Sequence, residues 1–226
     1  MEDVAANLQL LEARIAAACE KAGRSRDDVQ LVAVSKKQDA EKLRAAFDAG
    51  QAIFGESKVQ EARAKIPLLP AALRWHFIGH LQKNKIRHAL PLFEMFHSVD
   101  SLALAQDMQR IGDEEGMRPR VLLEVNVAAE GSKFGFAPEN LKEQMEALLQ
   151  LDRLEIEGLM TIPPFAPEAE DSRGYFVQLR KLRDAIEQEF ALRLPQLSMG
   201  MSNDYEVAIE EGATFVRVGT AIFGER

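Results

Sequence analysis

Lys36 stands directly after an apolar run, in a position where a lysine side chain could do covalent chemistry. The run is Gln-Leu-Val-Ala-Val-Ser at residues 30–35, and the two-residue period of a strand puts Val32, Val34 and Lys36 on one face. Partial burial favours the neutral amine of a lysine, which can attack an aldehyde and form a Schiff base. The alternative is a lysine that extends its ammonium group to solvent from the strand end, as we expect for Lys37 on the opposite face.

Glycines and hydroxyl side chains gather in two segments near the C-terminus. The segments are 198–204 and 217–221, and each follows or ends a short apolar run. Glycines let backbone N–H groups come close to a bound phosphate, and Ser202 and Thr220 could add side-chain donors. Ordinary turns and helix caps use the same residue types, so these segments indicate a site only in conjunction with Lys36.

Arg217 lies in an otherwise apolar run, where a permanent charge needs a partner. It precedes Gly219 by two residues and therefore shares its face of the strand. One alternative is a structural ion pair with one of the 36 acidic residues of the chain. The other is donation of hydrogen bonds to an acceptor on a bound ligand.

Eight short apolar runs alternate with segments of helical spacing. The predicted strands are 30–35, 52–54, 75–78, 95–98, 121–125, 154–160, 196–199 and 215–218, and helical segments include 40–49, 101–115, 139–149 and 172–192. This alternation predicts an α/β fold in which crossover helices connect parallel strands. Eight units favour a single (β/α)8 TIM barrel over residues 1–226, with an open doubly wound sheet as the alternative.

The two ends of the chain favour the barrel. The sequence stops at Arg226, soon after the eighth strand, which leaves no room for a full closing helix. A helix over residues 5–21, whose apolar positions recur at spacings of three and four, could fill that place. Reactive groups of such barrels lie at the C-terminal ends of the strands, and the last two loops commonly hold phosphate. Closure would bring Gly219 and Thr220 close to Lys36.

Composition excludes several classes of function. The formal net charge of −8 gives an acidic surface that repels nucleic acid, so we predict no nucleic-acid partner. Cys19 is the single cysteine, which excludes an internal disulfide and a cysteine metal cluster and fits a reducing compartment. Acidic residues near Met1 do not resemble a signal peptide, and no apolar run reaches membrane-spanning length. We expect a cytoplasmic protein without a membrane partner.

Two further groups of residues carry weaker signals. His76 and His80 fall across a strand and its loop rather than on one helical face, so we predict no metal site. His80, at the mouth of the predicted barrel, is a candidate ligand contact. The basic segment 83–88 is either the solvated face of a short helix or an attractor for an anionic cofactor or an acidic partner.

Six blocks of the sequence resemble the pyridoxal phosphate homeostasis protein family, in order and over essentially the whole length. The blocks are LVAVSK at 31–36, FGE and VQE within 54–61, WHFIGHLQKNK at 75–85, GLMTI at 158–162, LSMGMS at 197–202 and VRVGTAIFG at 216–224. The resemblance implies a barrel similar to the N-terminal domain of alanine racemase. It also implies pyridoxal 5'-phosphate (PLP) as the cofactor, bound as a Schiff base on Lys36.

The resemblance implies roles for further residues. Ser202, Gly219 and Thr220 would surround the phosphate, and Arg217 would donate to the pyridine nitrogen. An arginine there keeps that nitrogen unprotonated and makes the ring a weak electron sink, which restrains carbanion chemistry. The family commonly has asparagine where this chain has Ser57, whose hydroxyl offers fewer hydrogen bonds than an amide. It also often has threonine where this chain has Lys37.

The function implied is that of a cofactor carrier in PLP (vitamin B6) and amino-acid homeostasis, without robust turnover. PLP-dependent apo-enzymes are the candidate recipients, and we expect a monomer because the dimer-forming second domain of the racemases is absent. One alternative is a PLP-dependent amino-acid racemase, for which Tyr175 and Tyr205 are the available tyrosine bases. Another is an aldolase-like barrel in which Lys36 captures a carbonyl substrate directly.

Overall fold

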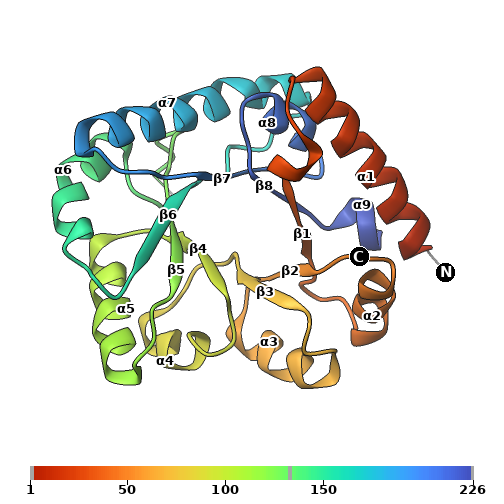
Figure 1. Ribbon diagram of the computed structural model, residues 1–226, viewed down its shortest axis with the longest axis horizontal. Coiled ribbons are helices and arrows are strands. Elements are labelled where there is room, and N and C mark those ends of the chain that lie inside the picture. Colours follow the sequence, from red (N-terminus) through yellow and green to blue (C-terminus); the bar gives the residue numbers. More distant parts are fainter. Residues whose placement is uncertain (1–2, 132–133, 225–226) are drawn as a thin grey trace.

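Eight parallel strands form a closed barrel, with helices between them on the outside (Figure 1). The computed structural model describes residues 3–131 and 134–224. The strands are β1 (Gln30–Val34), β2 (Ile53–Glu56), β3 (Arg74–Phe77), β4 (Met95–Val99), β5 (Arg120–Glu124), β6 (Glu155–Met160), β7 (Gln196–Met201) and β8 (Phe215–Val218). Each lies within two residues of a predicted strand, and the predicted barrel is confirmed, because each strand pairs with the next along the chain and β8 pairs with β1.

The helices follow the expected alternation. They are α1 (Val4–Lys21), α2 (Ala40–Asp48), α3 (Val59–Lys65), α4 (Ile86–Ala89), α5 (Leu102–Glu115), α6 (Pro138–Leu149), α7 (Arg173–Phe190), α8 (Tyr205–Glu210) and α9 (Thr220–Phe223), with short 3-10 turns η1 (Arg26–Asp28), η2 (Ile66–Leu68), η3 (Lys83–Lys85) and η4 (Ala169–Ser172). The first helix packs against α2, α8 and α9 on the outside of the barrel, as predicted (Figure 1). It therefore takes the place that a closing helix after β8 would occupy.

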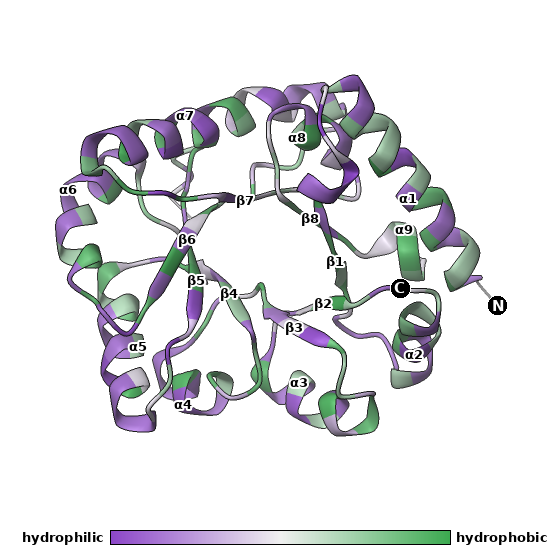
Figure 2. Cartoon of the chain, in the orientation of Figure 1, coloured by the Kyte–Doolittle hydropathy of each residue, from purple (hydrophilic) through white to green (hydrophobic). Residues whose placement is uncertain are grey.

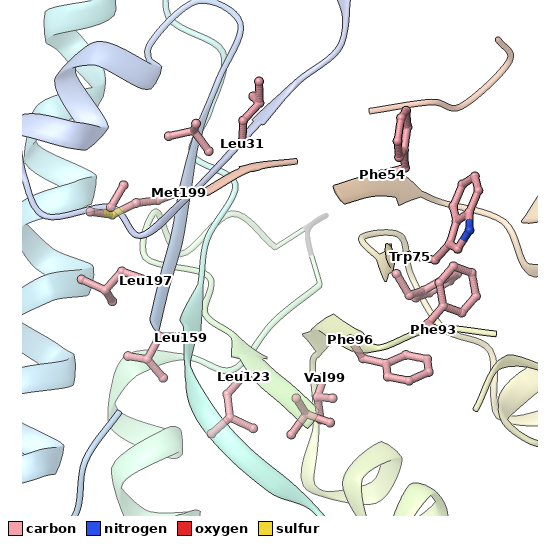
Figure 3. Close-up of a cluster of buried hydrophobic side chains, with 14 of the residues drawn as sticks. Leu31, Phe54, Trp75, Phe93, Phe96, Val99, Leu123, Leu159, Leu197 and Met199 are labelled. Carbon is pink, nitrogen blue, oxygen red and sulfur yellow. The ribbon is translucent and has the colours of Figure 1, made fainter. Parts of the chain in front are cut away.

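Alternate residues of each strand enter two different cores. Outward-facing side chains such as Leu31, Phe54, Trp75 and Leu123 pack between the strands and the apolar inner faces of the helices (Figures 2 and 3). Inward-facing side chains make a smaller apolar cluster inside the barrel: Val32, Ile53, Met95, Leu122, Met160 and Phe215. The inside of the barrel also holds buried polar residues, which are described below.

The register of barrel closure decides which loops meet. Val32 pairs with Arg217 and Ala33 with Val218, so the next residues along, Val34 and Gly219, come side by side. The end of β1 thus meets the end of β8, as the sequence predicted. Among the described residues, no helix is both long and apolar enough to cross a membrane.

Candidate functional site

Lys36 lies in the turn that follows β1, at the barrel mouth, with its side chain half-buried. Val32, four residues earlier, belongs to the inner cluster, and Lys36 follows the end of β1 by two residues. Lys37 is exposed and has a φ of 60°, in the left-handed region that tight turns use. The N–H of Lys37 donates to the Glu61 carboxylate, which holds this turn. Of the two lysines, Lys36 is thus the more buried.

A largely buried ionic cluster of Lys65, Glu56 and Glu61 holds the turn that follows β1. Lys65 of α3 donates to the carbonyl oxygen of Ser35 at 2.7 Å, to Glu56 at 2.8 Å and to Glu61 at 2.7 Å. Burial raises the pKa of Glu56, although hydrogen bonds from Lys65 and Ser35 oppose this. Burial would also raise the pKa of Glu61, but hydrogen bonds from Lys65 and the Lys37 N–H outweigh it and lower that pKa.

The loops after β7 and β8 meet beside the end of β1. A Cβ on Gly219 would lie 3.2 Å from both the Cβ and the carbonyl oxygen of Val34, so only glycine allows this approach without displacing β1. The N–H of Gly219 points to the Ser202 hydroxyl at 3.4 Å, and Thr220 is exposed at the start of α9. The three residues predicted to hold a phosphate thus lie together because β7 and β8 are neighbours, and barrel closure brings Gly219 beside the end of β1.

Arg217 is buried inside the barrel with neutral hydrogen-bond partners. Its guanidinium donates to the Ser198 hydroxyl and, at 2.9 Å, to the Thr161 carbonyl oxygen. Burial lowers its pKa to about 10, while the more distant carboxylates of Glu124 and Asp204 oppose that shift. The side chain remains charged at neutral pH, and no carboxylate of the described residues forms a salt bridge with it. The structural ion pair considered from the sequence is therefore not formed within this part of the chain.

Two carboxylates at the mouth were missed by sequence reasoning. Glu124 ends β5 on the same inward face as Leu122, and Asp100 follows β4. Burial raises the pKa of Glu124 to about 7; the charge of Asp100 adds to this shift and the charge of Arg217 opposes it. The sequence feature that could have indicated Glu124 was an acidic residue within the otherwise apolar predicted strand 121–125. Glu124 can hold or release a proton at neutral pH.

Ser57 and His80 follow β2 and β3, on the other side of β1 from Gly219. Together with Lys58 and Lys85 they line a cavity of about 390 Å³ whose walls do not include Lys36. A Cβ on Gly79 would lie 2.8 Å from the Cβ of Ser57, so the glycine lets these loops touch. The two predicted contacts thus form the β2–β3 rim, apart from the cluster at β1, β7 and β8.

The His80 ring is fixed from two directions. Its Nδ1 atom lies 2.9 Å from Asp100 Oδ2. Its face stacks on Phe134, with ring centroids 3.8 Å apart and planes inclined by 15°. Asp100, in turn, raises the pKa of Glu124, so a row of ionisable side chains runs along the rim of the mouth from β3 to β5.

The basic segment 83–88 is largely neutralised. The Lys83 ammonium lies 2.9 Å from the Asp107 carboxylate, and Arg87 pairs with Glu114 and Glu115. The three acidic residues all belong to α5. This favours the solvated face of a short helix over a free basic surface. Among the described residues, no group of three or more histidine, cysteine or acidic side chains is arranged to hold a metal ion.

Tyr205 is directed away from the mouth. It is 2% exposed, its hydroxyl donates to Glu206 at 3.2 Å, and the Arg14 guanidinium of α1 lies 5.7 Å from its ring centroid. Burial raises its pKa to about 12. These contacts belong to the interface between α8 and the outer helix α1, so the hydroxyl does not face Lys36.

Comparison with known proteins agrees with this geometry. A family model, alanine racemase N-terminal domain, matches residues 6–226. The pyridoxal phosphate homeostasis protein of Aquifex aeolicus is 46% identical over 94% of each chain. That of Escherichia coli K12 is 40% identical over all of this chain and 98% of its own. The chain belongs to the pyridoxal phosphate homeostasis protein family. The resemblance stated from the sequence blocks is therefore confirmed.

Solved structures of this family have the same barrel. PipY of Synechococcus elongatus, solved with PLP bound, superposes with a TM-score of 0.86 at 40% identity, over 98% of this chain and all of its own. Alanine racemase of Clostridium difficile has a TM-score of 0.76 at 16% identity, and the match covers 99% of this chain but 57% of the racemase. At that identity the likeness concerns the fold alone.

Proposed function

We propose that this protein binds PLP at the barrel mouth, as a Schiff base on Lys36, and acts as a cofactor carrier in PLP and amino-acid homeostasis. The observation that carries the proposal is the closure of β1 on β8, which brings the end of β1, two residues before Lys36, beside Gly219 and pairs it with the strand that carries the buried Arg217. The family relatives, named for PLP homeostasis, and the PLP bound to PipY support the same conclusion.

The side chains at the mouth fit the chemical groups of PLP. The amine of Lys36 can condense with the aldehyde and release one water, a step that needs no other reactant. Ser202, Gly219 and Thr220 offer hydroxyl and backbone donors for the phosphate. Arg217, charged and without a carboxylate partner among the described residues, suits a neutral acceptor such as the ring nitrogen. Ser57 and His80 would border the ligand from the β2–β3 rim.

PLP supplies electron withdrawal from the carbon bonded to its imine nitrogen, and the residues here would moderate that effect. An arginine has too high a pKa to give its proton to the ring nitrogen, so the ring stays a weak electron sink. Tyr205, directed towards Glu206 and Arg14, is not placed to serve as a second base. Both features support a carrier without robust turnover.

A PLP-dependent racemase is the second candidate function, and Glu124 is the observation that favours it. A carboxyl group with a pKa of about 7 at the barrel mouth is suited to proton transfer at neutral pH. Glu124 lies across the barrel from β1, so Lys36 and Glu124 could act on opposite faces of a substrate. Exchange of the substrate α-proton in deuterated water distinguishes the two functions.

The proposed carrier function also implies particular partners, a cellular location and an oligomeric state. Apo-enzymes that depend on PLP would receive the cofactor at the open mouth, and the protein would act as a cytoplasmic monomer without nucleic-acid or membrane partners. The acidic composition, with a formal net charge of −8, supports the exclusion of nucleic acid. Size-exclusion chromatography with light scattering would test the monomer.

Trapping by borohydride tests the covalent assignment. Reduction of the PLP-loaded protein followed by mass spectrometry should place the adduct on Lys36. Lys36→Ala should fold normally and show neither the visible absorbance band nor the adduct, whereas the matched control Lys37→Ala should retain both. An adduct on Lys37 or elsewhere would refute the assignment, and absence of any PLP adduct from the wild type would refute the proposed function.

A further inference from the structure

Four buried polar side chains form a hydrogen-bonded row inside the barrel, beginning at Arg217. Arg217 donates to the Ser198 hydroxyl, which lies 2.8 Å from His97 Nδ1. The other ring nitrogen of His97 lies 3.0 Å from His76 Nδ1. These four residues come from β8, β7, β4 and β3; Arg217 is 4% exposed and the other three are 0% exposed.

Every hydrogen bond in this row is donated in the same direction, from Arg217 towards His76. Arginine can only donate, so Ser198 accepts from Arg217 and gives its own hydroxyl proton to His97 Nδ1. His97 must then carry its proton on Nε2 and donate to His76 Nδ1. In the opposite direction the Ser198 hydroxyl proton would have no acceptor among the described residues, whereas His76 Nε2 lacks a partner in either direction.

The surroundings keep both imidazoles neutral. Burial lowers the pKa of His76 to about 3, and burial, with His76 and Arg217 adding to it, holds that of His97 well below 6.5. The edge of Phe215 packs against both rings, with centroids 5.5 Å from His76 and 5.2 Å from His97. His76 Nε2 is buried and has no hydrogen-bond partner among the described residues, so the row ends there. A proton cannot leave Arg217 along this path.

We propose that His97, supported by His76, is a positioning residue: it holds the Ser198 hydroxyl as an acceptor for Arg217 and so aims the guanidinium at the ring nitrogen of the ligand. Arg217 uses one N–H for Ser198 and one for the Thr161 carbonyl, which anchors the planar group at two points. Without the Ser198 acceptor, one anchor remains and the guanidinium can rotate. This inference rests on the proposed function, because PLP provides the ring nitrogen.

The test compares the affinity of PLP with that of its 1-deaza analogue, in which CH replaces the ring nitrogen. The wild type should bind PLP more tightly, and His97→Leu should reduce the ratio of the two affinities about tenfold, the usual effect of a charge-assisted hydrogen bond. His97→Asn, whose amide oxygen can accept from Ser198, should keep the ratio within about twofold. Met95→Leu, on the same inward face of β4, is the matched control and should leave it unchanged. Should His97→Leu fail to fold, Ser198→Ala carries the same expectation.

A merely structural role for His97 predicts equal losses for both ligands, and that result would overturn the inference. Nitrogen-15 NMR of the protein alone adds a second readout, in which His97 and His76 should be neutral with the proton on Nε2 at pH 7. A proton on Nδ1 of His97 would equally overturn it. If the wild type binds neither ligand, the proposed function fails, and the NMR result still decides the direction of the row.

Discussion

The ammonium nitrogen of Lys65 lies 2.7 Å from the carbonyl oxygen of Ser35, the residue immediately before Lys36. Lys65 is 9% exposed and also bonds Glu56, which is fully buried. A helix residue thus fixes the backbone from which the proposed Schiff-base lysine extends. This contact links the stability of the fold directly to the geometry of the site.

Replacement of Lys65 should therefore affect both stability and cofactor capture. Lys65→Met leaves the Glu56 carboxylate buried without its cation, which should cost about 3 kcal/mol of unfolding free energy at neutral pH. The folded variant should also form the PLP adduct more slowly, because the Lys36 turn loses its anchor. Urea unfolding and stopped-flow absorbance measure the two effects.

Two companion variants make this prediction specific. Arg63→Met, on the exposed side of the same helix, should change neither quantity. Adding Glu56→Gln to Lys65→Met removes the unpaired charge and should restore part of the stability. If the double variant is no more stable than Lys65→Met, the buried charge is not the cause of the loss.

The phosphate assignment predicts a selective effect on affinity. Replacing both Ser202 and Thr220 with alanine should weaken PLP binding by about a hundredfold, the effect of two hydrogen bonds to a charged group. Binding of unphosphorylated pyridoxal should change little. Asn203→Ala is the matched control, since its amide bonds the Ala166 carbonyl in the neighbouring loop. Equal losses for the two ligands would mean that the phosphate binds elsewhere.

The raised pKa of Glu124 predicts a pH-dependent gain in stability for Glu124→Gln. Glutamate has a pKa of 4.5 when unfolded and about 7 in the fold, so the fold favours its protonated form. The stability that this preference contributes is complete below pH 4.5 and is lost as pH rises through 7. Glutamine does not titrate, so the variant should gain on the order of 2 kcal/mol over the wild type at about pH 8 and almost nothing near the unfolded pKa.

Urea unfolding at several pH values measures this gain, with exposed Glu146→Gln on α6 as the control. A constant difference between the variant and the wild type from about pH 5 to 8 would show that Glu124 does not titrate in that range.

The carrier function predicts slow exchange of the α-proton of amino acids in deuterated water. The PLP-loaded wild type should show no appreciable exchange with the common L-amino acids, because a ring nitrogen facing Arg217 stabilises a carbanion poorly. Proton NMR follows the loss of the α-proton signal. Tyr205→Phe should be indistinguishable from the wild type, since the hydroxyl contacts Glu206 on the outer side of α8.

Fast exchange would favour the racemase instead. If it disappears in Lys36→Ala and in either Glu124→Gln or Tyr205→Phe, the protein is a two-base enzyme and the carrier assignment is wrong. The variant that abolishes exchange would identify the second base.

Much of this protein was predictable from local patterns in the sequence. Short apolar runs located all eight strands, and their two-residue period placed Arg217 on the inward face of β8. The eight alternating units and the apolar face of the helix before β1 together indicated a closed barrel. Closure then implied that Gly219 lies beside the end of β1, which the register confirms.

The tertiary structure alone decided which polar groups meet inside the barrel. In the sequence, His97 is one polar residue in an apolar run, and its partners Ser198 and His76 lie 101 and 21 residues away. Lys65 carries no sequence signal at all, because it is one of many lysines on helices. A strand's period fixes the face of a residue but not its neighbours across the barrel, since these depend on the stagger of all eight strands. Burial, which shifts the pKa of Glu124, follows from the same closure and from no local pattern.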